Sequence, residues 1–168
     1  SDLFQYVYEH RDEFYSIYGE RDVKRKIQNV WGGGANRFVN KEGDRMVLDK
    51  KGFKRYVKRM EKANVDGWED IASGAEMMNA EKLGDWKTYI ALGTERIKQG
   101  KVSDLLLYNW GLRVNKQCKD KALRLLAARW FDDAVVKAAK NEVERKGNMM
   151  SYRTFFEKLA KDLKADVQ

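Results

Sequence analysis

Apolar residues recur every third or fourth position along most of the chain, which is the spacing that lines one face of a helix. The clearest case is a helical hairpin predicted over residues 103–136, in which Ser103 supplies the N-cap hydroxyl and the polar run 115–120 separates two apolar stripes. The first stripe contains Leu106, Leu107, Trp110 and Val114, and the second contains Ala122, Leu125, Leu126, Arg129, Trp130 and Ala134. Two helices cover only part of each other's apolar surface, so we expect further helices on both sides.

The same spacing, with its caps and glycines, predicts the other helices. Asp49 and Asp85 stand at N-cap positions, and Gly19, Gly84 and Gly100 follow helix ends. The polar segment 40–44 is expected to be an exposed loop, with only a brief extended stretch at 45–48. The predicted helices cover residues 2–18, 20–31, 49–63, 66–84, 85–100 and 135–146, with a last helix capped by Ser151. The predicted fold class is therefore all-α, with about eight or nine helices.

Three consecutive glycines, Gly32 to Gly34, interrupt the second helical pattern. Each glycine costs a helix roughly 1 kcal/mol relative to alanine. Either the helix ends at Trp31, or a neighbouring element packs so closely that only bare backbone fits. The run lacks the Gly-Lys-Ser/Thr ending of a phosphate-binding loop, and no strand is predicted before it.

Two predicted hairpins, residues 66–99 and 103–136, are each about 34 residues long, which is the period of tetratricopeptide repeats. Small residues such as Ala91 and Gly93 suit positions where helices cross closely, although the proline that usually ends such a repeat is missing. We expect residues 1–168 to form a single helical-repeat domain, a right-handed tetratricopeptide-like stack of antiparallel hairpins. A division into sub-lobes 1–63 and 64–168 is the alternative.

Composition supports a folded, helix-rich chain. Hydrophobic residues make up 43% and charged residues 36%, and proline is absent. The single cysteine, Cys118, excludes an internal disulfide and a two-cysteine redox motif within these residues. We expect a packed or half-exposed thiol, and a reactive one is the alternative because Lys116, Lys119 and Lys121 would favour the thiolate. The net charge is 34 basic minus 26 acidic residues, or +8, which fits either a solvated face or an acidic partner. No apolar run is long enough to predict a membrane span.

A further pattern near the start of the chain consists of Phe4-Gln5-Tyr6-Val7, His10, Phe14, Tyr18-Gly19, Val23 and Ile27. It resembles the helical, tetratricopeptide-like region of multidomain thioredoxin-family proteins of Bacteroidetes. The step Asp120-Lys121-Ala122-Leu123 is similar to one that opens a helix in the same region. The resemblance implies a periplasmic or cell-envelope location and a role beside a thiol-disulfide oxidoreductase domain. No Cys-x-x-Cys occurs here, so no catalytic residue carries over.

Residue chemistry nominates no reaction centre, so we expect no catalytic, cofactor-binding or metal site within these residues. His10 is the only histidine and has no metal-ligand partners at suitable spacing. The one candidate site is a partner groove formed by Trp110, Arg113, Arg129 and Trp130, in which indoles and guanidinium groups would bind carboxylates of a peptide. Burial of the tryptophans in the core is the competing interpretation.

The sequence therefore favours a non-enzymatic interaction or scaffold domain, accessory to a thioredoxin-like thiol-disulfide oxidoreductase of the cell envelope. Its expected partner is a protein or peptide segment, in particular an acidic one, or a thioredoxin-like domain of the same parent chain. The alternative is a basic helical nucleic-acid-binding protein, suggested by the charge and by the basic residues between Lys50 and Lys62.

Overall fold

The computed structural model describes residues 2–144 and 152–165. They are mostly helical, with nine helices and one small two-stranded sheet, which confirms the all-α fold class. The chain divides into two compact units, residues 1–83 (unit 1) and 84–168 (unit 2). The division falls at the helix end predicted before Gly84, whereas the alternative in the sequence lay after residue 63. The end predicted at residue 146 and the cap predicted at Ser151 lie outside the described residues.

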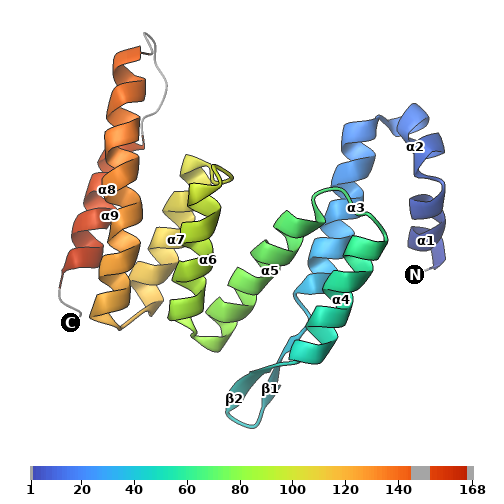
Figure 1. Ribbon diagram of the computed structural model, residues 1–168, viewed down its shortest axis with the longest axis horizontal. Coiled ribbons are helices and arrows are strands. Elements are labelled where there is room, and N and C mark those ends of the chain that lie inside the picture. The colour runs from blue at the N-terminus through green and yellow to red at the C-terminus, as the bar shows by residue number, and fades with distance from the viewer. Residues whose placement is uncertain (1, 145–151, 166–168) are drawn as a thin grey trace. The chain divides into compact units, whose positions relative to one another are not determined.

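Unit 1 contains five helices and a β hairpin among its described residues (Figure 1). In chain order they are α1 (Asp2–Glu9), α2 (Arg11–Tyr18), α3 (Glu20–Ala35), β1 (Val39–Glu42), β2 (Arg45–Leu48), α4 (Lys50–Lys62) and α5 (Trp68–Leu83). Helices α3 and α4 lie side by side, and α5 packs against both of them. The core between them contains Val23, Ile27, Met60, Val65 and Ala72, with a second cluster formed by Ala35, Phe53 and Ala75.

Two predictions for unit 1 were wrong in detail. The first helix is broken at His10, whose backbone leaves the helical region with φ −104° and ψ 24°. The polar segment 40–44, expected as a loop, forms most of β1 and the two-residue turn of an antiparallel hairpin, in which Glu42 pairs with Arg45. Gly43 supplies the positive φ of 60° that this turn requires. The brief extended stretch predicted at 45–48 is confirmed as β2, whereas β1 was missed, because a four-residue strand forms only by pairing with its neighbour.

The glycine run does not end its helix, because α3 continues through Ala35. The close approach of α4 explains why one of the three positions is a glycine. A Cβ atom on Gly34 would lie 2.7 Å from Cζ of Tyr56, whereas one on Gly33 would meet nothing within 4 Å. The Tyr56 hydroxyl donates a hydrogen bond of 2.9 Å to the carbonyl of Trp31. Of the two explanations that the sequence left open, close packing is confirmed at Gly34.

Unit 2 contains α6 (Trp86–Lys98), α7 (Asp104–Gln117), α8 (Lys121–Glu144) and α9 (Arg153–Lys164). The predicted caps are confirmed: the Asp85 carboxylate accepts from the Thr88 amide at 3.0 Å, and the Ser103 hydroxyl from the Leu106 amide at 3.3 Å. The separate helix predicted from residue 135 is instead a continuation of α8. Helices α8 and α9 run antiparallel along each other (Figure 1), and α7 packs against both.

The buried face of α8 is only partly the one that the sequence predicted, because Trp130 is buried but most of the other predicted positions are exposed. Leu125, Leu126 and Arg129 are exposed, and so is Ala122, whereas the buried positions are Arg124, Ala127, Ala128, Trp130 and Phe131. The ring of Phe131 contacts Phe156 of α9, with 5.5 Å between their centroids. The leucines of α8 offered an alternative apolar face for burial, but the face that packs against α9 is the one containing Phe131.

Candidate interaction surfaces

The two tryptophans of the predicted groove lie in the interior of unit 2. Trp110 is 7% exposed and Trp130 is 5% exposed, and their rings meet edge to face with 6.2 Å between centroids. The indole N–H of Trp130 donates to the hydroxyl of Thr94 on α6 at 2.8 Å, so its polar atom is satisfied inside the protein. The structure thus brings the two indoles together, but little of either ring is accessible to a partner.

The two arginines of the predicted groove are exposed on different helices, Arg113 on α7 and Arg129 on α8. The guanidinium group that lies over the Trp110 ring belongs instead to Arg96 of α6, with 5.9 Å from Cζ to the ring centroid. Arg96 has no local sequence signal for this role, because it reaches Trp110 only through the packing of two helices. Binding by the four predicted residues stays a prediction.

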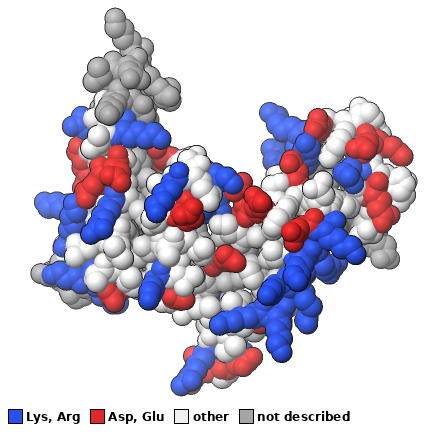
Figure 2. All heavy atoms as spheres, in the orientation of Figure 1, with Lys and Arg blue, Asp and Glu red and all other residues white. Residues whose placement is uncertain are grey.

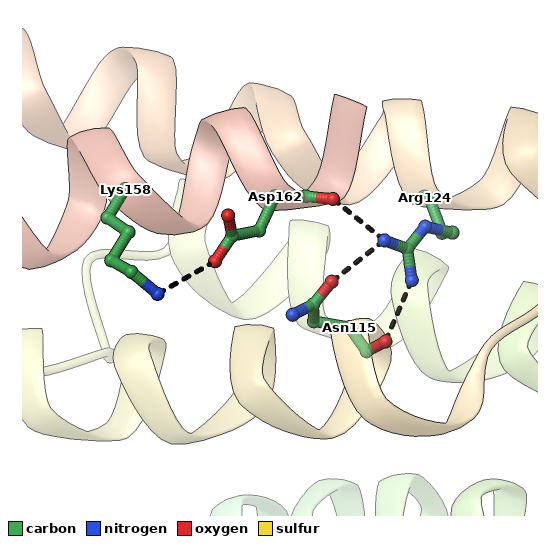
Figure 3. Close-up of polar contacts among 4 residues, drawn as sticks. All are labelled: Asn115, Arg124, Lys158 and Asp162. Carbon is green, nitrogen blue, oxygen red and sulfur yellow. Dashed lines mark hydrogen bonds and ion pairs between the residues drawn. The ribbon is translucent and has the colours of Figure 1, made fainter. Parts of the chain in front are cut away.

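Arg124 is a buried cation in unit 2 that the sequence did not single out. It is 5% exposed and lies between the C-terminal turns of α7 and α9 (Figure 3). One terminal nitrogen donates to the carbonyl of Asn115 at 2.8 Å and to that of Cys118 at 3.3 Å. The other donates to Oδ1 of Asn115 and to the carbonyl of Asp162, both at 2.8 Å.

These contacts explain how a charge without a carboxylate partner can be buried in unit 2. The last carbonyls of a helix have no amide partners within the helix, and they form the negative end of its dipole. Arg124 supplies donors to such carbonyls at two helix ends at once, and the carboxylate of Asp162 pairs with Lys158 at 3.2 Å instead (Figure 3). The role of Arg124 is therefore structural.

Cys118 is fully buried beside this arginine, in the turn between α7 and α8. Burial raises the pKa of its thiol above the usual value, and the nearby Asp120 and Arg124 act on that pKa with smaller effects. A reactive cysteine needs thiolate character and solvent access. Of the packed and half-exposed states that the sequence favoured, the packed one is observed.

The largest concentration of one charge sign lies on α4 in unit 1. Seven basic side chains are exposed on this helix of thirteen residues, and Figure 2 shows them as a continuous basic area. We call this surface the α4 basic face; its residues are Lys50, Lys51, Lys54, Arg55, Lys58, Arg59 and Lys62. None of them forms an ion pair with a carboxylate of the described residues. Glu61 is the only acidic residue within the helix.

The α4 basic face has a regular geometry because its residues are four positions apart in two rows. Lys50, Lys54, Lys58 and Lys62 form one row, and Lys51, Arg55 and Arg59 form the other. Four residues advance a helix by about 6 Å, so each row places a positive charge at about that interval. Unpaired like charges at this spacing repel one another and favour an anionic partner.

Helix α4 is held in place along its opposite side. Phe53 is 7% exposed and Met60 is fully buried. Burial raises the pKa of Tyr56 above its usual value, and its hydroxyl donates a hydrogen bond to the carbonyl of Trp31. At the C-terminal end, the hydroxyl of Tyr8 donates to the carbonyl of Ala63. The basic rows are therefore presented by a helix whose position is already fixed.

Within the two described ranges, no group of three or more His, Cys, Asp or Glu side chains is placed to hold a metal ion. His10 stacks on Tyr6 with 4.2 Å between ring centroids, and its Nδ1 lies 2.9 Å from the Tyr6 carbonyl. No helix in these ranges has the length and the apolar character needed to cross a bilayer.

A scan against protein-family models gave no match, and searches of curated proteins and of solved structures gave none either.

Proposed function

We propose that this chain is a non-enzymatic interaction domain whose α4 basic face binds an acidic segment of a protein partner. The observation that carries the proposal is the seven unpaired basic side chains on one anchored helix. A helix fixed by its buried side loses little conformational freedom when it binds, which favours its use as a docking surface. The regular spacing suits a partner with carboxylates at similar intervals, such as an acidic helix.

The positions of the aromatic rings favour a protein partner over a nucleic acid. Single-stranded nucleic acids are bound by aromatic side chains on which bases stack. Phe53 and Tyr56, the aromatic residues interleaved with the basic ones, are directed into unit 1 instead. Binding to the phosphates of a duplex needs no such stacking and is the second candidate, because it would use the same seven charges.

The wider context of the proposal comes from the resemblance to thioredoxin-family proteins. It supports an accessory role beside a thioredoxin-like thiol-disulfide oxidoreductase, in the periplasm or cell envelope, and a right-handed tetratricopeptide-like array. A Cys-x-x-Cys domain and a secretory signal encoded upstream in the same gene would support this context. An upstream region that encodes neither would remove it without affecting the proposed role of α4.

The test compares two variants with the same change of charge. Lys54→Gln/Lys58→Gln removes two charges from one row of the α4 basic face, and Lys87→Gln/Lys98→Gln removes two exposed charges from α6. The probe is a synthetic helical peptide with glutamate at every fourth position. Loss of two exposed ion pairs should weaken its binding roughly 2- to 30-fold in the α4 variant. The α6 variant should bind as the unaltered protein does.

Two outcomes would contradict the proposal. Equal weakening by the α4 and α6 variants would mean that only net charge matters, and no binding of the peptide by the unaltered protein would remove the acidic segment as the ligand. A DNA duplex bound more tightly than the peptide at equal ionic strength would favour the second candidate. In that case, the logarithm of the binding constant should fall linearly with the logarithm of salt concentration.

A further inference from the structure

The leucine stripe of α8 is exposed, although the sequence predicted its burial. Leu126 is 44% exposed, Val136 is 58% exposed, and Leu125, beside them, is 41% exposed. Leu126 and Val136 belong to a series whose spacing alternates between four and three residues: Ala122, Leu126, Arg129, Asp133 and Val136. This is the spacing of the a and d positions of a coiled coil, which form the contact between two helices.

We call this series the outer stripe of α8, and its two charged members have no partners within the described residues. Arg129 and Asp133 are both exposed, and neither forms a hydrogen bond or ion pair there. The adjacent Asp132 differs, because its Oδ1 lies 2.7 Å from Nζ of Lys164 on α9. The carboxylate of Asp132 is thus paired within unit 2, whereas Asp133 lies unpaired on the outer stripe together with Arg129.

We propose that the outer stripe of α8 is the contact surface between two copies of this chain, packed antiparallel about a two-fold axis. In such a contact, residues i and j pair twice, once in each direction. Placing the axis beside residue 131 pairs Leu126 with Val136 of the second copy and Arg129 with Asp133 of the second copy. This register pairs the two larger apolar members of the series with each other and the two charged members with each other.

This self-complementarity identifies a second copy as the partner. With the axis between residues 127 and 128, for example, Arg129 would lie opposite Leu126 and Asp133 opposite Ala122, so neither charge would face its opposite. The stripe itself carries one basic and one acidic residue and has no net charge. The outer stripe therefore favours neither an acidic nor a basic protein. A second copy of the chain, in contrast, places an opposite charge against each of its two charged residues.

The test uses charge reversal at the two sites that face each other. Arg129→Asp places two acidic residues on each stripe, and Asp133→Arg places two arginines there, so each single variant should repel its own copies. Sedimentation equilibrium over a wide range of protein concentration should show the unaltered chain as a monomer–dimer mixture. Each single variant should associate roughly tenfold or more weakly, because like charges replace two attractive pairs.

Two further samples make the result specific to the proposed register. The double variant Arg129→Asp/Asp133→Arg should recover dimers, since it exchanges the two charges and keeps every pair. An equal mixture of the two single variants should form heterodimers, because each acidic stripe then faces a basic one. Circular dichroism should confirm that all variants remain helical, which they should because both positions are exposed.

Several outcomes would overturn the inference. A monomeric unaltered chain at the highest concentration would do so, and so would single variants that dimerise normally. Failure of the mixture to associate would exclude this register. The Lys54→Gln/Lys58→Gln variant should dimerise as the unaltered chain does, so a failure of the proposed function of α4 and a failure of this inference are distinguishable.

Discussion

Gly33 and Gly34 are neighbours in α3, but a side chain would meet different surroundings at the two positions. Gly33 has open space around it, whereas Gly34 faces the ring of Tyr56. Tyr56 cannot move away freely, because its hydroxyl is bonded to the carbonyl of Trp31. The same substitution therefore measures helix propensity at one position and packing at the other.

Gly33→Ala should stabilise the protein by up to about 1 kcal/mol, the gain expected from helix propensity. Gly34→Ala should instead destabilise it by about 1–3 kcal/mol, because overpacking outweighs that gain. Urea unfolding followed by circular dichroism measures both free energies. Adding Tyr56→Phe to Gly34→Ala should recover part of the loss, since it removes the nearest atom. Equal stabilisation by the two alanine variants would contradict this, because it would show that the Tyr56 ring moves aside without lowering the free energy of unfolding.

Arg124→Ala should lower the free energy of unfolding by about 3 kcal/mol or more, since buried acceptors lose their donors at roughly 1–3 kcal/mol each. Arg124→Lys should restore only part of this, because an ammonium group cannot span the acceptors that the planar guanidinium reaches. Arg129→Ala on the same helix is the control and should change stability by less than about 0.5 kcal/mol at low protein concentration. Similar losses for Arg124 and Arg129 would refute the helix-end role.

At the scale of whole elements, the ends of the helices carry most of what the sequence could specify. Asp49, Asp85 and Ser103 were predicted as N-caps, and each accepts a hydrogen bond from the amide three residues later. Such caps are local, because donor and acceptor lie within one turn. Only the surroundings of a helix decide which side of it is buried, and for that reason most positions of the face predicted for α8 were wrong, Trp130 excepted.

The cap of α6 also makes stability depend on pH. Hydrogen bonds from Thr88, and to a lesser degree the charge of Lys87, lower the pKa of Asp85 in the folded state. A carboxyl group with a lowered pKa stabilises the fold above its unfolded pKa, near 3.9, and loses this contribution as pH falls through the folded pKa. The contribution should therefore be complete at neutral pH and disappear in acid.

Asp85→Ala should cost about 0.5–2 kcal/mol at neutral pH, which is typical for the loss of a cap. The difference from the unaltered protein should shrink below about pH 4, where the aspartate itself becomes protonated. Asp85→Asn keeps a capping oxygen and cannot ionise, so its own cap energy should not change over this range. Urea unfolding at several pH values tests the prediction, and a pH-independent cost for Asp85→Ala would contradict it.

At the scale of the molecule, charge is unevenly distributed along the chain. Of its 34 basic residues, seven lie on the α4 basic face of unit 1 without carboxylate partners, whereas the exposed stripe of α8 in unit 2 combines one arginine and one aspartate. An excess of one sign attracts partners of opposite charge from a distance and speeds their association, while a balanced pair acts only on contact. The two proposed interactions therefore involve different surfaces and depend on different forces, which are long-range attraction at α4 and short-range charge pairing at α8.

The all-α class, most helix boundaries and the caps were determined by the sequence itself, since periodicity and capping act within a few residues. Tertiary structure decided the role of Gly34, the burial of Arg124 and the choice of Arg96 as the neighbour of Trp110. It also buried the two tryptophans of the predicted groove and exposed the leucine stripe of α8. Each of these outcomes depends on contacts between residues on different helices, and a local pattern contains no information about which helices meet.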